Sequence, residues 1–111
     1  AKGHGRQNLI EGQLANNARV VVIEDLVSTG MSSLQAVDAL REAGANVLGM
    51  GAIFTYGFQK AVDAFTEKNC SLFTLSDYDH LLQVAEGRNT LNAQEAKTLA
   101  QWRQDPESWG K

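Results

Sequence analysis

Two adjacent acids, Glu24 and Asp25, are followed by a segment rich in hydroxyl groups and glycine, Leu26-Val27-Ser28-Thr29-Gly30-Met31-Ser32. The acids end a β-branched run, and the segment leads into a helical pattern. A helix N-terminus has unpaired N–H groups and about half a positive charge, so it attracts a phosphate group. Gly30 allows the backbone to approach such an anion closely. Hydroxyl donors are Ser28, Thr29, Ser32 and Ser33.

The two carboxylates must serve another part of the same ligand, because they repel phosphate. Sugar hydroxyls are donors and suit carboxylate acceptors, so the motif indicates a ribose 5-phosphate site. The alternative is that Glu24 and Asp25 merely precede a helix that Ser32 caps. A Walker loop is excluded because no Gly-Lys-Ser/Thr follows. A Rossmann fingerprint is excluded because G-x-G-x-x-G is absent at this turn.

The elements around this motif alternate between strands and helices. The continuous run Arg19–Glu24 predicts a strand in the middle of a parallel sheet, with helices on both faces. Leu34, Val37 and Leu40 are spaced as one face of a helix over 32–43, which Gly44 ends. Residues 46–55 predict the next strand, so 19–55 form a βαβ unit with a right-handed crossover.

The alternation continues toward the C-terminus. A helix over 58–68 precedes a strand over 71–75. Two further helices are expected, one from the cap pair Ser76 and Asp79 to Gly87, the other from Asn92 and Glu95 to about Gln104, where Asp105-Pro106 stops it. The pattern predicts an α/β fold, a parallel sheet flanked by helices. A three-stranded parallel sheet that contains a strand apolar on both faces would leave an open edge, so we expect the C-terminal part of a longer protein.

Composition excludes several classes of protein. A length of 111 residues, 43% of them hydrophobic and 21% charged, suits one globular domain. A net charge of −3 without a basic stripe argues against a nucleic-acid binder. The single cysteine, Cys70, fits a reducing compartment and a cytoplasmic protein. No apolar run approaches the roughly 18 residues of a membrane span, and no signal peptide opens the chain.

The string Glu24-Asp25-Leu26-Val27-Ser28-Thr29-Gly30 behind a hydrophobic strand resembles the signature with which type I phosphoribosyltransferases bind 5-phosphoribosyl 1-diphosphate (PRPP). The resemblance implies that the acidic pair holds the ribose 2- and 3-hydroxyls, with Asp25 also counted as catalytic. It implies that the loop from Leu26 to Ser33 wraps the 5-phosphate. The PRPP-binding set would be Glu24, Asp25, Leu26, Val27, Ser28, Thr29, Gly30, Met31 and Ser32.

The opening Lys2-Gly3-His4-Gly5, followed by Asn8-Leu9-Ile10-Glu11-Gly12, resembles the flexible catalytic loop of orotate phosphoribosyltransferases. In that branch the loop closes over the active site of the partner subunit, which implies a homodimer in which Lys2 and His4 act in trans. Departure of diphosphate builds negative charge that a lysine can neutralise and a histidine can protonate. Magnesium would be held mainly by substrate and water. Taken alone, Lys2 and His4 are typical of incidental charges at a frayed terminus.

Segments 53–58, 72–78 and 102–110 resemble one bacterial subset of the same branch, so the resemblance covers residues 1–111 as a single domain. It implies that 1–12 is the catalytic loop and that 13–111 holds the PRPP-binding core and C-terminal helices. The implied reaction joins orotate and PRPP in pyrimidine biosynthesis. Tyr56 stands where some relatives have an arginine for orotate, which leaves Ser28 as the orotate candidate. Met31 stands where relatives often have a small residue.

Two other functions remain open: a PRPP-sensing regulator of the same fold, and a purine phosphoribosyltransferase. A regulator that binds nucleic acid should have a basic face, and a sensor has no leaving group for Lys2 to neutralise.

Four further features are given structural roles: His80 lies on the surface, Cys70 lies in the core, Trp102 and Trp109 are packing anchors, and Asp77 with Asp79 form caps rather than a metal pair.

Overall fold

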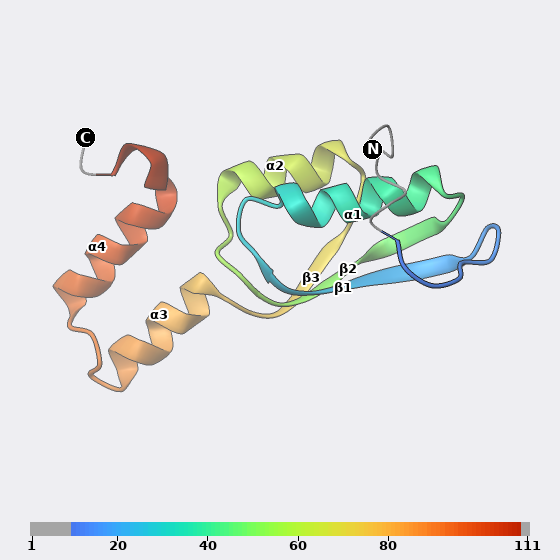
Figure 1. The fold of residues 1–111 in the computed structure, drawn as a ribbon. Coiled ribbons are helices and arrows are strands. Elements are labelled where there is room, and N and C mark those ends of the chain that lie inside the picture. The colour runs from blue at the N-terminus through green and yellow to red at the C-terminus, as the bar shows by residue number, and fades with distance from the viewer. Residues whose placement is uncertain (1–9, 110–111) are drawn as a thin grey trace.

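The structure is a computed structural model and describes residues 10–109 (Figure 1). Parallel strands alternate with helices, which confirms the α/β class and the order of the predicted elements. In chain order the elements are β1 (Arg19–Val27), α1 (Met31–Glu42), β2 (Asn46–Thr55), α2 (Gln59–Glu67), β3 (Leu72–Asp77), α3 (Tyr78–Gly87), α4 (Ala93–Gln104) and the 3-10 helix η2 (Pro106–Ser108).

Within residues 10–109 the sheet has the order β1-β2-β3, so its central strand is β2, whereas the sequence predicted that the strand over Arg19–Glu24 lies in the middle. β1 continues to Val27, beyond the predicted end at Glu24, because Leu26 pairs with Phe54 and Val27 with Thr55. Leu26 and Val27 therefore belong to the strand, and the prediction that they form part of a loop is wrong. The two acids therefore lie inside β1, and Leu26 and Val27 separate them from the connection to α1.

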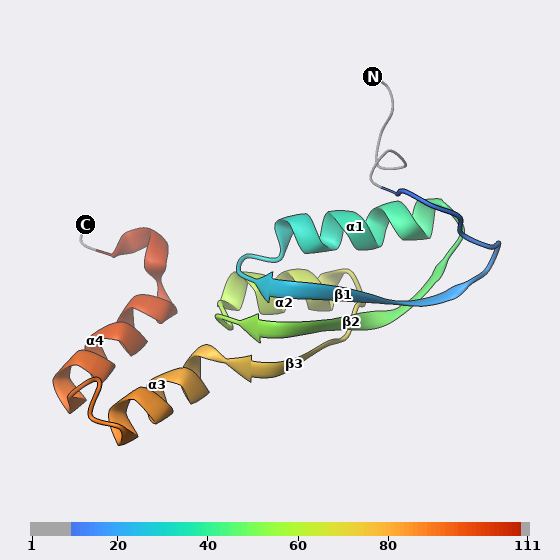
Figure 2. The ribbon, with the colours of Figure 1, turned by 60° about the horizontal axis from the view of Figure 1, so that its bottom comes forward.

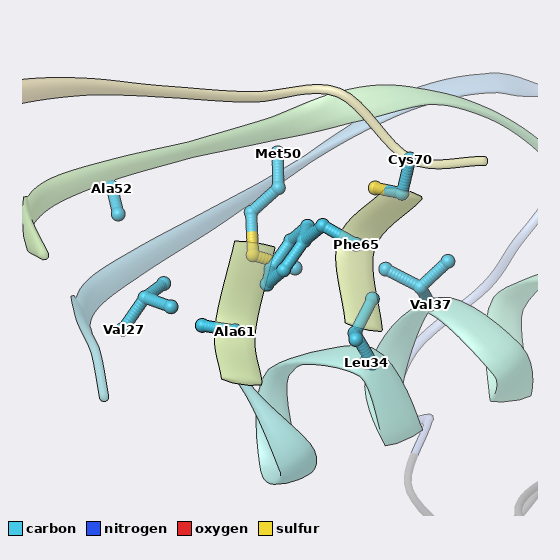
Figure 3. Close-up of a cluster of buried hydrophobic side chains, with 8 residues drawn as sticks. All are labelled: Val27, Leu34, Val37, Met50, Ala52, Ala61, Phe65 and Cys70. Atoms are coloured by element: carbon cyan, nitrogen blue, oxygen red, sulfur yellow. The ribbon is translucent and has the colours of Figure 1, made fainter. Parts of the chain in front are cut away.

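Helices α1 and α2 cover the same face of the sheet (Figures 1 and 2). The connections β1–α1–β2 and β2–α2–β3 both move in the same direction across the sheet. Because parallel crossover connections share the same handedness, α1 and α2 lie on the same side. The core lies between them and the strands, with Val27, Val37 and Met50 fully buried (Figure 3). Because Val27 is anchored in this core, the segment that follows it starts from a fixed position.

The opposite face of the sheet exposes large apolar side chains. Ile23 is 77% exposed, Phe73 60% and Leu75 85%. Alternate strand residues point to opposite faces, so the continuous apolar run of β1 supplies both the core and this surface. Helices on both faces were expected; within residues 10–109 only the α1 and α2 side is covered.

Helices α3 and α4 lie beyond the carboxyl end of the sheet (Figures 1 and 2). Asp77, not Ser76 as predicted, caps α3, because its side chain accepts the His80 N–H at 2.9 Å. Ser76 is still paired with Phe54 in the sheet and cannot act as the cap. The predicted capping box of Asn92 and Glu95 is confirmed at the start of α4.

Aromatic rings connect this helical pair to the end of β2. Tyr56 stacks on Phe58 at a centroid distance of 5.1 Å, and Trp102 lies 5.6 Å from Phe58 and 5.7 Å from Tyr78. Trp102 is thus a packing anchor, as predicted, whereas Trp109 is 49% exposed. Cys70 is buried, also as predicted, and burial raises the pKa of its thiol, although the Arg41 charge opposes this.

In the part of the chain that the structure describes, no helix combines the length and apolar character that a membrane crossing needs. His80 was predicted to lie on the surface, and its side chain is indeed 71% exposed beside Asp77.

Candidate functional site

Glu24 and Asp25 lie near the carboxyl end of β1, and their side chains leave opposite faces of the strand. Glu24 is half-buried on the side of α1, where its Oε2 accepts a hydrogen bond of 2.8 Å from Ser33 Oγ. Asp25 is exposed, and its backbone N–H donates to Glu24 Oε1 at 3.3 Å. Both carboxylates therefore remain accessible at the edge of the sheet where the chain turns toward α1.

The connection between β1 and α1 is only Ser28-Thr29-Gly30. Gly30 is the N-cap of α1 and has a left-handed backbone with φ of 88°. A Cβ atom built on Gly30 would lie 2.9 Å from the Phe65 ring, so a larger residue would collide with α2. Glycine is thus required here because the backbone of residue 30 lies close to Phe65. The sequence instead predicted that glycine allows the backbone to approach the anion.

The N-terminus of α1 is open to a ligand. Gly30 provides no side-chain cap, and no acidic residue stands in the first turn. Thr29 Oγ1 lies 3.5 Å from the Met31 N–H, the outer limit of a hydrogen bond. The alternative that Ser32 caps the helix is wrong, because Ser32 is its second residue. The N–H groups of the first turn have no partner within the helix, and they follow the two carboxylates closely along the chain, an arrangement suited to a phosphorylated sugar.

The turn after β2 is joined to the turn after β1 through Thr55. Thr55 Oγ1 donates to the Val27 carbonyl oxygen at 3.1 Å and accepts the Gly57 N–H at 3.1 Å. The Tyr56 N–H donates to the same carbonyl at 3.3 Å. Thr55 is not among the site residues predicted from the sequence. Its position as the last residue of a neighbouring parallel strand was the available signal, because carboxyl ends of parallel strands meet at one edge.

Arg103 of α4 holds the Tyr56 end of this edge. Its guanidinium lies 2.9 Å from Asp79 Oδ1 and 3.4 Å from the Tyr56 carbonyl oxygen. A hollow of about 380 Å³ runs from Thr29 to Arg103, α2 and η2. Lys60 in this hollow is 3.5 Å from Glu107, so its charge is already balanced. The hollow borders the β1–α1 turn but offers no unpaired cation to an anion.

The structure brings most of the predicted site residues to one edge. Contiguous at this edge are Glu24, Asp25, Ser28, Thr29, Gly30, Met31 and Ser32. Val27 is fully buried, so it can present only its backbone. Tyr56 packs among aromatic rings instead of pointing freely into a site. Lys2 and His4 lie outside the described residues. Across residues 10–109, no three His, Cys, Asp or Glu side chains gather as a metal site.

Relatives of known sequence match the whole chain, although no protein-family model matches it. It is 53% identical to an orotate phosphoribosyltransferase of Listeria innocua over 111 residues, 100% of this chain and 53% of that protein. It is 52% identical to one of Bacillus caldolyticus over 110 residues, 99% of this chain and 53% of that protein. The chain thus spans about half the length of the curated relatives it matches.

Solved structures share the arrangement of strands and helices. Leishmania donovani UMP synthase superposes with a TM-score of 0.68 and 26% identity, over 84% of this chain and 21% of that one. A Mycobacterium tuberculosis orotate phosphoribosyltransferase in complex with inorganic phosphate superposes with a TM-score of 0.57 and 30% identity, over 63% and 41% of the two chains. The chain therefore has the type I phosphoribosyltransferase fold and is homologous along its whole length to part of the orotate phosphoribosyltransferases.

Proposed function

We propose that the protein carrying this sequence is an orotate phosphoribosyltransferase, which transfers the phosphoribosyl group of PRPP to orotate and releases orotidine 5-monophosphate and diphosphate. The observation that carries the proposal is the open N-terminus of α1 beside Glu24 and Asp25. The relatives that match the full chain at 50–53% identity bear the name of this activity.

Two kinds of protein group would bind the two parts of the ligand. Backbone N–H groups and hydroxyls of the Ser28–Ser32 segment would receive the 5-phosphate, where the helix dipole favours negative charge. Glu24 and Asp25 would accept hydrogen bonds from the ribose hydroxyls. The phosphate complex of the Mycobacterium relative is consistent with an anion site in this fold. Ser28, exposed at the start of the connection between β1 and α1, is the candidate contact to orotate.

Lys2 and His4 are proposed to act on the leaving diphosphate of the partner subunit's site, within a homodimer. Magnesium would supply charge neutralisation at the diphosphate, and the exposed Asp25 carboxylate suits contact with such an ion through water. The single cysteine, kept as a buried thiol, fits the proposed cytoplasmic location.

Orotate consumption tests this proposal directly. The complete gene product that carries this sequence is mixed with PRPP, magnesium and orotate, and the loss of orotate absorbance is followed. We expect orotate to be consumed, with no turnover when uracil or hypoxanthine replaces it. Turnover of hypoxanthine would favour the purine enzyme, and PRPP binding without turnover of any base would favour the regulator. Either result would overturn the proposal.

The role of Lys2 has a separate test. A Lys2→Ala variant of the complete protein should lose orotidine 5-monophosphate formation while it still binds PRPP, because the lysine acts on the departing charge. Unchanged turnover would remove Lys2 from the mechanism. We expect the 111 residues alone to turn over poorly or not at all, since they span about half of the relatives.

A further inference from the structure

We propose that Ser33 is a positioning residue: its hydroxyl holds the Glu24 carboxylate in the orientation that receives the ribose hydroxyls. The inference rests on the proposed function of the β1–α1 site and adds a residue outside the PRPP-binding set named from the sequence. Its basis is a partly buried hydrogen bond between the first helix and the strand that carries the acids.

Ser33 is placed for this task by the period of α1. It lies one turn before Val37, which is fully buried, so the two side chains face the sheet together. Ser33 itself is 3% exposed, so its hydroxyl lies in the protein interior. Its Oγ lies 2.8 Å from Glu24 Oε2, a short, charge-assisted hydrogen bond. A buried hydroxyl on an otherwise apolar helix face is thus committed to one carboxylate.

The hydrogen bond leaves Glu24 able to bind a ligand. A carboxylate has about four acceptor positions. Ser33 occupies one at Oε2, and the Asp25 N–H approaches Oε1 at 3.3 Å. The remaining positions can accept two neighbouring hydroxyl groups. Because Ser33 restricts the rotation of the side chain, ordering of Glu24 is completed during folding and does not weaken ligand binding.

The sequence predicts that the Ser33 hydroxyl is a donor to the phosphate, but the structure gives this hydroxyl a different partner. A hydroxyl has one proton to donate, and in this structure it goes to Glu24. Ser33 Oγ is therefore not a donor to the phosphate, in contrast to the exposed Ser28 and Ser32. Removal of this hydroxyl should affect sugar recognition and leave phosphate recognition intact.

Calorimetric titration of a Ser33→Ala variant tests the inference. The complete gene product is titrated with ribose 5-phosphate and, separately, with inorganic phosphate. A lost hydrogen bond to a charged group predicts about tenfold weaker binding of ribose 5-phosphate. Affinity for inorganic phosphate should stay within about twofold of wild type, because the backbone donors are unchanged. A general disturbance of α1 would weaken both ligands equally, which would overturn the positioning role.

A double-mutant cycle shows whether Ser33 acts through Glu24. In a Glu24→Ala background, which has no acceptor for the Ser33 hydroxyl, the further change Ser33→Ala should cost much less ribose 5-phosphate affinity than in wild type. Additive losses would overturn the inference. A Thr66→Ala variant is the control, since the Thr66 hydroxyl donates only within α2, to the Val62 carbonyl oxygen at 2.9 Å, and its loss should leave both affinities unchanged.

The same titrations distinguish failure of the positioning role of Ser33 from failure of the function proposed for the β1–α1 site. If wild-type protein binds ribose 5-phosphate and Ser33→Ala binds it equally well, the positioning role is overturned and the function proposed for the site stands. If wild-type protein binds neither ribose 5-phosphate nor inorganic phosphate, the site itself has been misassigned.

Discussion

The Thr55 hydroxyl lies 3.1 Å from the Val27 carbonyl oxygen and 3.1 Å from the Gly57 N–H, so a single side chain ties together the turns that follow β1 and β2. Val27 directly precedes the Ser28–Gly30 connection, and Gly57 has a φ of 69°. The position of the candidate phosphate loop therefore depends on a strand that carries none of the predicted ligand contacts.

Replacement of Thr55 by valine should loosen this junction. Valine keeps the shape but loses the donor and the acceptor, so we expect a loss of about 1–2 kcal/mol in the free energy of unfolding. Weaker binding of PRPP should accompany it, because the β1–α1 turn is less well held. Urea denaturation and calorimetry measure the two effects. Thr55→Ser keeps the hydroxyl and should retain PRPP affinity; equal behaviour of the two variants would contradict the prediction.

Gly30 should tolerate no side chain. Its φ of 88° and the 2.9 Å approach of a built Cβ to Phe65 predict that Gly30→Ala costs about 1–3 kcal/mol and displaces the start of α1. Thermal unfolding and PRPP titration would detect both changes. Gly87→Ala is the matched control, since nothing lies within 4 Å of a Cβ at that position and its φ is not positive. A stable Gly30→Ala protein with normal PRPP binding would show that the turn is less constrained than the contacts indicate.

The exposed sheet face should make the 111-residue chain self-associate when it is isolated. Ile23 and Leu75, 77% and 85% exposed, form part of an apolar surface that water solvates poorly. The double change Ile23→Lys and Leu75→Lys should shift sedimentation toward the monomer. Leu81→Lys on α3, 50% exposed, controls for added charge away from the sheet. If that control disperses the chain equally well, the sheet face is not the cause.

Asp77 should make the start of α3 sensitive to acid. The His80 backbone N–H, and then the His80 side chain, lower the pKa of the Asp77 carboxyl. A lowered pKa in the folded state means that the stabilisation is complete above the ordinary value of about 3.9 and is lost as the pH falls through the lower folded value. Asp77→Asn keeps a capping group but cannot titrate. Urea unfolding measured from about pH 5, above the ordinary pKa, down to about pH 2 should therefore show a flatter pH dependence for Asp77→Asn than for the wild type.

Local patterns were enough to predict most of the elements and the candidate site. The β-branched run of β1, the apolar spacing of α1 and the capping box of Asn92 and Glu95 all act between residues close in sequence. The site motif is also contiguous, so its acids and its helix N-terminus are neighbours in any fold that forms β1 and α1. That is why a ribose-phosphate site could be inferred from the order of the residues.

Local sequence patterns could not predict the contacts between segments that are distant in the sequence. Pairing with β2 extended β1 to Val27, and pairing with β3 kept Ser76 in the sheet, so that Asp77 became the cap of α3. The direction of the two crossovers left one sheet face open, and packing of α2 gave Gly30 its neighbour in Phe65. The bond of Thr55 to Val27 belongs to the same class. Only nine residues separate Ser33 from Glu24, but their bond depends on how α1 packs on β1, and no local propensity encodes either contact.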